Sequence, residues 1–264
     1  MKVMQHISRI CAGSAMGREL FHCEDEMGLI LVTQRGGKRV LSFASGFEQS
    51  SVLIECPARL THEYTQIMLL GLLFVEVRHI TLLGLGGGGL VHCLSHFYPQ
   101  CQLQVVELRQ QVIEVARNWF ELPQTEQIVL HCGDAARYIA GAPAAHTDLI
   151  LSDLYEADGM SEVQASVFYI RSCARHLSDS GVMVLNFHQL PTSQSELMQV
   201  ISEQFSEVFV CDVFSGNYVM FCLKRPMQDS LSAMLPQARA LAKYLQMPLL
   251  YYFRQLRRFE DEAI

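Results

Sequence analysis

Five acidic residues stand where an α/β sheet would present them to a ligand. Glu107, Asp134 and Asp153 each end or directly follow an apolar strand candidate, and Glu156 and Asp158 come soon after Asp153. In open α/β sheets, ligands bind beyond the carboxyl ends of the strands, where carboxylates can accept ribose hydroxyls, an amine or a proton. Any one of these acids, taken alone, could simply cap the helix that follows its strand. Their recurrence after successive strands favours a shared binding site.

A glycine-rich turn precedes these acids. The apolar run 80–83 leads into residues 84–89, which have the sequence GLGGGG, and a helix-like segment follows at once. Glycines let a backbone approach a ligand closely, and a helix start offers unpaired N–H groups and the positive end of the helix dipole. We therefore expect Gly84, Gly86 and Gly87 to lie against a nucleotide or nucleoside. The spacing also satisfies G-x-G-x-x-G, so a nicotinamide dinucleotide is a competing ligand, although no obvious hydride-transfer residues accompany it.

Strands and helices must alternate to bring these residues together. Such alternation predicts a doubly wound α/β sheet that is mostly parallel, and the short turn 215–217 makes the last two strands antiparallel to each other. The strand candidates are 78–83, 103–107, 127–131, 149–153, 182–187, 208–214 and 218–223, and the helix candidates are 60–76, 89–97, 110–119, 134–140, 161–177 and 193–204, with one or two more helices after residue 230.

The first part of the chain follows a different pattern. Strand candidates at 29–33, 39–43 and 50–54 are separated by turns and suit a small antiparallel sheet. A sheet of this size has little core of its own, so it should pack on the main domain or on another subunit. We therefore divide the chain into a small N-terminal β domain, 1–56, and a Rossmann-like nucleoside-binding catalytic domain, 57–264.

The composition limits the classes of partner. Half of the residues are apolar and 18% are charged, which predicts a large core and a surface partly covered by a second subunit, as in a homodimer. The net charge of −7 gives no electrostatic reason to bind nucleic acid or an anionic membrane, and the longest apolar run, 67–75, is too short to span one. The nine cysteines include no C-x-x-C pair, which favours reduced thiols, a cytoplasmic location and no bound metal.

Taken together, these motifs resemble the spermidine synthase-like proteins, the polyamine aminopropyltransferases, between about residues 29 and 188. The resemblance is carried by Gly46-Phe47-Glu48-Gln49-Ser50, by Tyr64 in an apolar helix, by the glycine turn, by Val106-Glu107-Leu108, by Gly133-Asp134-Ala135 and by Asp153-x-x-Glu156. It implies the seven-stranded Rossmann-like sheet of class I methyltransferases and a transferase that moves an aminopropyl group from decarboxylated S-adenosylmethionine to a small amine such as putrescine.

The resemblance also implies roles for individual residues. Gln49 and Glu107 would hold the ribose and sulfonium region of the donor, and Asp134 would face the adenine amine. Asp153 matches the catalytic acid of the family, and Tyr64 matches a residue that helps to hold the attacking amine.

The acids after Asp153 could bind the positively charged amines of the acceptor. Glu156, three residues on, could help to attract and orient the acceptor amine, while a further acid such as Asp158 anchors its far end. Tyr155 would lie near the acceptor.

Three departures from the family pattern leave the reaction open. The family has an acid at the position of Gly87, which suits the free amine of the decarboxylated donor. It has Val-Glu-Ile-Asp where this chain has Val106-Glu107-Leu108-Arg109, and Asp-x-x-Asp-Pro where this chain has Asp153-Leu154-Tyr155-Glu156-Ala157. A methyltransferase that uses intact S-adenosylmethionine on an unknown acceptor, and a non-catalytic nucleoside-binding protein, are therefore the alternative interpretations.

Overall fold

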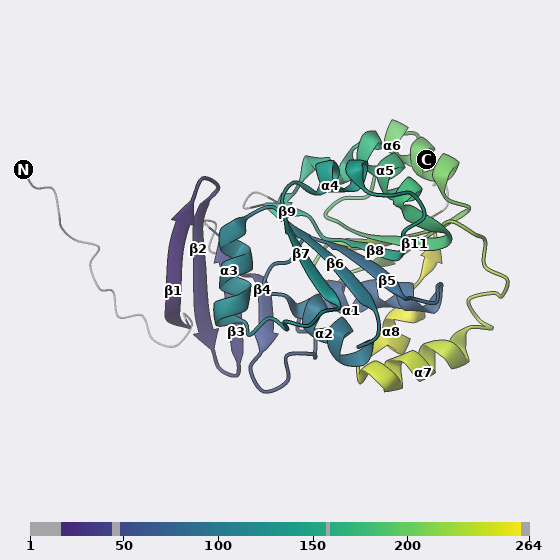
Figure 1. Cartoon of the computed structure of the whole chain (residues 1–264). Helices are drawn as coiled ribbons and strands as arrows, with labels where there is room; N and C mark the ends of the chain where they lie inside the picture. Colours follow the sequence, from purple (N-terminus) through teal and green to yellow (C-terminus); the bar gives the residue numbers. More distant parts are fainter. Residues whose placement is uncertain (1–16, 44–47, 157–158, 260–264) are drawn as a thin grey trace, which may run out of the picture.

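A large twisted sheet with helices on both faces forms the centre of the molecule, and a smaller sheet stands beside it (Figure 1). The computed structural model describes residues 17–43, 48–156 and 159–259, without the side chain of Glu156. Asp158, which we expected in the acceptor site, lies outside the described residues, as do Gly46 and Phe47.

The central sheet has eight strands in the order β14-β12-β13-β11-β8-β5-β6-β7. Strands β7, β6, β5, β8 and β11 run parallel, and β13, β12 and β14 are joined antiparallel. The expectation of a doubly wound, mostly parallel sheet is confirmed, with one two-residue strand beyond the seven expected. The strands are β5 His79–Leu83, β6 Gln102–Glu107, β7 Ile128–Cys132, β8 Thr147–Ser152, β11 Leu177–Phe187, β12 Glu207–Asp212, β13 Tyr218–Leu223 and β14 Arg257–Arg258.

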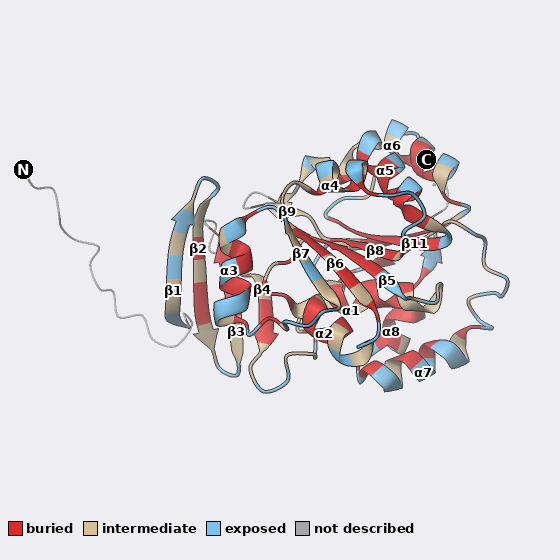
Figure 2. Ribbon diagram, in the orientation of Figure 1, coloured by how far each residue is buried: buried red, intermediate tan, exposed pale blue. Residues whose placement is uncertain are grey.

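Side chains of the parallel strands alternate between two hydrophobic cores. Leu82 packs in the core on one face of the sheet, whereas the next residue, Leu83, packs in the core on the other face. Burial on both faces explains the continuous apolar runs 149–151 in β8 and 182–185 in β11 (Figure 2). Helices α1 Glu63–Met68, α2 Gly89–Phe97, α7 Leu235–Leu245 and α8 Leu249–Phe253 cover one face, and α4 Ala135–Gly141, α5 Val167–His176 and α6 Glu196–Gln204 cover the other.

Two predicted helices are shorter than expected. The helix expected over 60–76 is α1 followed by a 3₁₀ turn, η1 Leu69–Leu73, in which Gly71 approaches β11 so closely that a β-carbon would lie 2.7 Å from Val184 Cγ2. The helix expected over 161–177 begins only at Val167, after a second 3₁₀ turn, η2 Glu162–Ala165. In the described ranges, no helix is both long enough and apolar enough to cross a membrane.

The smaller sheet consists of β1 Arg18–Asp25, β2 Gly28–Arg35, β3 Lys38–Phe43 and β4 Glu48–Leu53, all antiparallel. Its apolar face packs against helix α3 Gln110–Trp119. The sequence pattern did not reveal β1, because this edge strand is half exposed and carries no regular apolar alternation. The division of the chain at residue 56 stays a prediction.

One buried arginine connects the two sheets. The Arg109 guanidinium donates two hydrogen bonds to Asp25, at 3.0 Å and 2.7 Å, and one to the Gly28 carbonyl at 2.7 Å. It also lies over the Phe43 ring, with 4.7 Å between Cζ and the ring centroid. The hydrogen bond from Arg109 lowers the pKa of Asp25, so this pair is charged at neutral pH. Arg109 therefore fixes the β1–β2 turn at the carboxyl end of β6.

We predict that Arg109→Met lowers the free energy of unfolding by about 3 kcal/mol, because it leaves Asp25 without its bidentate partner. Arg171→Met is the matched control, since its pair with Glu203 is about half exposed and should contribute less than about 1 kcal/mol. Urea denaturation of the two variants measures both changes. Equal losses in the two variants would contradict a connecting role for Arg109.

Candidate active site

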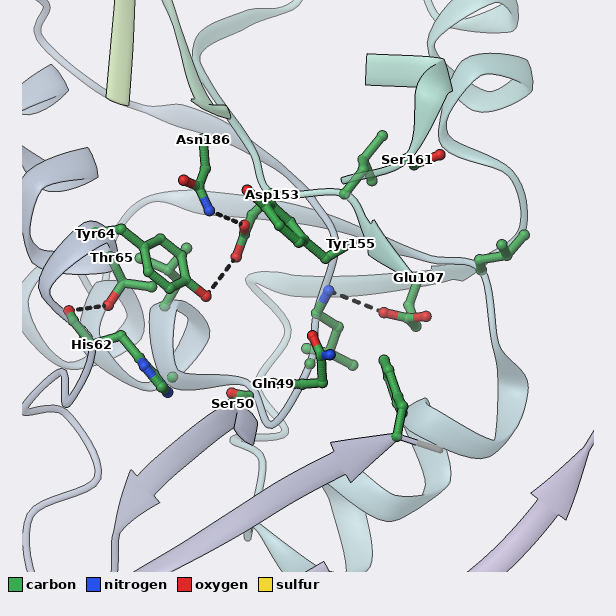
Figure 3. A pocket seen from close by; sticks show the side chains of 18 of the residues that line it. Gln49, Ser50, His62, Tyr64, Thr65, Glu107, Asp153, Tyr155, Ser161 and Asn186 are labelled. Atoms are coloured by element: carbon green, nitrogen blue, oxygen red, sulfur yellow. Dashed lines mark hydrogen bonds between the residues drawn. The ribbon is translucent and has the colours of Figure 1, made fainter. Parts of the chain in front are cut away.

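A cavity of about 410 Å³ opens at the carboxyl ends of the central strands. It lies where the strand order reverses, because β5 continues to β6 on one side and pairs with β8 on the other. This is the position at which doubly wound sheets bind ligands. Strand β4 of the smaller sheet and the start of α1 close the cavity opposite the strand ends (Figure 3).

The glycine turn forms part of the cavity wall through Gly84, Leu85, Gly86 and Gly89. Gly84 has a φ of +100°, and a β-carbon there would lie 2.3 Å from the carbonyl oxygen of Asp153. The turn therefore requires glycine at this position, since any side chain would collide with the end of β8.

Gly87 does not line the cavity, unlike Gly84 and Gly86 in the same turn. A β-carbon at this position would lie 3.0 Å from two ring atoms of Phe120 and 3.2 Å from Ser50 Oγ. A side chain at Gly87 would thus press on Phe120 and Ser50, which would have to shift by a few tenths of an ångström to admit it. The contact of Gly87 with the donor stays a prediction.

Glu107 lies at the end of β6 with its carboxylate held by the glycine turn. Its Oε2 accepts a hydrogen bond from Leu85 N at 3.1 Å, and its Oε1 accepts one from Arg109 N at 2.9 Å. Burial raises the pKa of Glu107 in spite of these hydrogen bonds. A carboxylate in this environment is stabilised by hydroxyl donors, which the ribose of a nucleoside would supply.

Asp134, at the start of α4, and Gln49, in β4, line the same cavity. Asp134 caps helix α4, since its Oδ1 accepts a hydrogen bond from Arg137 N at 2.8 Å. The capping role and the expected adenine contact are compatible, because a carboxylate has a second oxygen. Gln49 extends from β4 toward the glycine turn (Figure 3).

Asp153 lies just beyond β8 with each carboxylate oxygen held by one donor. Asn186 Nδ2 donates to Oδ1 at 2.8 Å, and the Tyr64 hydroxyl donates to Oδ2 at 3.1 Å (Figure 3). Burial raises the pKa of Asp153, although both hydrogen bonds act in the opposite direction. Each oxygen keeps a lone pair. The carboxylate is therefore oriented and still able to accept a further hydrogen bond or a proton.

Two amide side chains hold Asn186, one of the two donors to Asp153, in place. Asn217 Nδ2, in the β12–β13 turn, donates to Asn186 Oδ1 at 2.9 Å and to the Tyr155 hydroxyl at 3.0 Å. Fully buried Gln164 accepts from Leu154 N at 3.1 Å and donates to the Asn186 carbonyl at 2.7 Å. The Gln164 side chain thereby links Leu154, the residue after Asp153, to Asn186.

The structure brings together most of the predicted site residues. Gln49, Tyr64, Gly84, Gly86, Glu107, Asp134, Asp153 and Tyr155 all line the cavity. Glu156 belongs to the short strand β9 Tyr155–Glu156, which pairs with β10 Gly159–Met160. The sequence interpretation missed Asn186, Asn217 and Gln164. Asn186 had a usable signal, as a polar residue inside the apolar run of β11.

The two hydrogen bonds to Asp153 give a test of this geometry. We predict that Tyr64→Phe raises the pKa of Asp153 further, because it removes a donor that stabilises the carboxylate. Tyr155→Phe is the control, because its hydroxyl makes no hydrogen bond to Asp153 among the described contacts. The titration of the Asp153 carboxyl carbon by NMR measures both. An equal upward shift in the two variants would contradict the specific role of Tyr64.

Comparisons with known proteins show which chains this one is similar to. The polyamine aminopropyltransferase of Neisseria meningitidis is 32% identical over 159 residues, which make up 59% of this chain and 60% of that protein. This chain thus spans about 60% of the length of that relative. A probable spermidine synthase from Corynebacterium glutamicum superposes with a TM-score of 0.70 at 18% identity, covering 88% of this chain and 94% of its own.

The fold also occurs in a methyltransferase. Human methyltransferase-like protein 13, solved in complex with SAH, superposes with a TM-score of 0.61 at 21% identity, covering 77% of this chain and 98% of its own. These likenesses confirm the class I methyltransferase type of fold. Residues 61–228, more than half of the chain, match the Spermine/spermidine synthase domain. The chain belongs to the spermine/spermidine synthase domain family.

Proposed function

We propose that the protein transfers an aminopropyl group from decarboxylated S-adenosylmethionine to a small amine such as putrescine. The observation that carries this proposal is the placement of Asp153. Its carboxylate is held by Tyr64 and Asn186 in the same cavity as Glu107 and the glycine turn. Relatives named polyamine aminopropyltransferase support the same reaction.

The donor would lie along the strand ends. Glu107 accepts the ribose hydroxyls, as the acid at the end of the second strand does in related nucleoside folds, and Asp134 accepts from the adenine amine. Gln49 approaches the donor from β4, opposite the glycine turn. The donor supplies a carbon next to a positively charged sulfur, which makes the thioether a good leaving group.

Asp153 would act on the acceptor. The amine arrives as an ammonium ion and is attracted to this carboxylate, which takes one of its protons. The freed lone pair forms a bond to the carbon next to sulfur, the carbon–sulfur bond breaks, and its electron pair stays on sulfur. The burial that raises the pKa of Asp153 makes it a better proton acceptor than an exposed carboxylate. Tyr64 stays a neutral donor, because burial raises its pKa well above its usual value.

The proposal also covers the oligomeric state, the location, the partners and two further acceptor contacts. The sequence favours a homodimer and a cytoplasmic location, with neither nucleic acid nor membrane as a partner. Glu156 and Asp158 are proposed to contact the acceptor. Each of these stays a prediction.

Calorimetry and product analysis test the proposed reaction. We predict that decarboxylated S-adenosylmethionine and methylthioadenosine bind, that intact S-adenosylmethionine binds more weakly, and that putrescine or cadaverine gains an aminopropyl group detectable by mass spectrometry. Preference for the intact donor together with methylated products would indicate a methyltransferase instead. The nucleoside proposal fails if neither sulfonium binds at millimolar concentration.

Asp153→Asn should lower the rate of transfer by at least about a hundredfold, because an amide cannot take the proton. Donor affinity should stay nearly unchanged. Asp179→Asn is the matched control, since it is the same substitution at a side chain that is 89% exposed and does not line the cavity. Equal loss of donor binding and transfer in Asp153→Asn would assign Asp153 to the donor site.

A further inference from the structure

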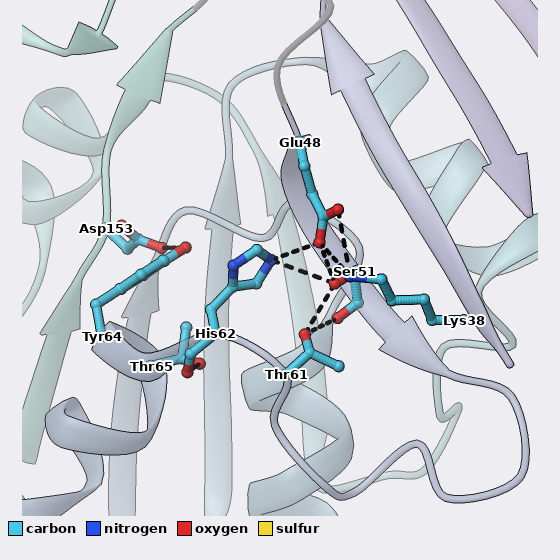
Figure 4. A network of polar contacts seen from close by, with 8 residues as sticks. All are labelled: Lys38, Glu48, Ser51, Thr61, His62, Tyr64, Thr65 and Asp153. Atoms are coloured by element: carbon cyan, nitrogen blue, oxygen red, sulfur yellow. Dashed lines mark hydrogen bonds and ion pairs between the residues drawn. The ribbon is translucent and has the colours of Figure 1, made fainter. Parts of the chain in front are cut away.

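A second polar cluster lies at the cavity wall, apart from the side chains that hold Asp153. It consists of Lys38, Glu48, Ser51, Thr61 and His62, and we call it the Glu48–His62 cluster (Figure 4). Four of its members, all except Lys38, line the cavity. The cluster joins strands β3 and β4 to the start of α1.

Glu48 is the anion of this cluster. Its Oε1 accepts hydrogen bonds from Ser51 Oγ at 2.6 Å and from Lys38 Nζ at 3.0 Å. Burial alone would raise the pKa of Glu48, but these hydrogen bonds and the positive charge of Lys38 outweigh it, so the pKa is lowered. Glu48 is therefore a carboxylate at neutral pH.

His62 stands between Glu48 and the Tyr64–Asp153 pair (Figure 4). Its Nε2 lies 3.5 Å from Glu48 Oε1 and 3.3 Å from Ser51 Oγ. Burial lowers the pKa of His62, against the pull of the Glu48 charge, so the ring is neutral at neutral pH. We assign the proton to Nε2, because a carboxylate can only accept.

The other ring nitrogen then carries a free lone pair. Nδ1 faces the Tyr64 side, where the centroids of the two rings are 5.7 Å apart (Figure 4). None of the hydrogen bonds between described residues uses this nitrogen, and the side chain keeps 24% of its surface exposed beside the cavity. The cavity wall therefore offers a hydrogen-bond acceptor backed by a carboxylate.

We propose that His62, backed by Glu48, binds an ammonium group of a ligand in this cavity, separate from the amine at Asp153. The inference rests on the proposed function. An ammonium has three N–H donors and no acceptor, so it matches a neutral nitrogen lone pair with a negative charge behind it. The Tyr64 side chain lies between His62 and Asp153, which makes two ammonium positions along one wall (Figure 4).

Two ligands could supply this ammonium group. One is the diamine acceptor, whose second amine would bind at His62 while its first amine lies at Asp153. The other is the decarboxylated donor, whose aminopropyl chain ends in a free amine. Both are alkyl ammonium ions, and the experiment separates them.

Two variants of His62 distinguish ligand binding from a structural role. His62→Gln places an amide near Nε2, so it keeps the contact with Glu48 and Ser51 but loses the acceptor at Nδ1. His62→Asn keeps an acceptor near Nδ1 and loses the contact with Glu48. We predict that His62→Gln weakens ammonium binding about tenfold, as expected for a hydrogen bond to a charged group, and that His62→Asn weakens it less. The opposite order would show that His62 only links β4 to α1 and would overturn the proposal.

The ligand whose binding or KM changes in His62→Gln identifies the source of the ammonium group. If the donor supplies it, His62→Gln weakens calorimetric binding of decarboxylated S-adenosylmethionine and leaves methylthioadenosine, which has no amine, unchanged. If the acceptor supplies it, His62→Gln raises KM for putrescine and leaves KM for butylamine and donor affinity unchanged. If the wild-type protein makes product but His62→Gln changes neither the affinity for decarboxylated S-adenosylmethionine nor the KM for putrescine, the inference is overturned. Failure of the wild-type protein to bind either sulfonium would overturn the proposed function itself, and the inference with it.

Discussion

The site depends on how closely the ends of β5 and β8 approach each other. Asp153 N donates to the Leu83 carbonyl at 2.8 Å, and a β-carbon on Gly84 would lie 2.3 Å from the Asp153 carbonyl oxygen. Only glycine fits there, with its φ of +100°. The contact that continues the sheet therefore also places the glycine turn beside the carboxylate, and donor and acceptor positions meet at this point.

Two carboxylates of this cavity, Asp153 and Glu107, lower the stability of the fold when no ligand is bound. Burial raises the pKa of Asp153 and of Glu107 above their values in an unfolded chain. The folded state then disfavours their charged forms, so each lowers the free energy of unfolding at neutral pH, and this loss disappears as the pH falls below the ordinary carboxyl range. A ligand that brings positive charge or hydroxyl donors would offset the loss on binding. The arrangement therefore favours a cationic nucleoside over an anionic one.

The sequence predicted those parts of the site that follow from local pattern. Glu107 and Asp153 end apolar runs, and a strand end is visible in the sequence itself. Asn186 and Asn217 could not be connected to Asp153 in this way, because their contacts depend on β11 lying between β8 and β13. The Glu48–His62 cluster depends likewise on the packing of the smaller sheet against α1. Gly87 shows the same limit, since the sequence revealed that the acid is missing there but not that Phe120 lies 3.0 Å from where a β-carbon would stand.

A crystal structure of the protein with methylthioadenosine would show whether the donor lies along the strand ends. We predict that the ribose hydroxyls contact Glu107, that the adenine lies toward Asp134, and that the sulfur lies on the side of the cavity that holds Asp153. A nucleoside bound in the reverse direction, or outside this cavity, would contradict the assignment of Glu107 to the ribose and of Asp153 to the acceptor.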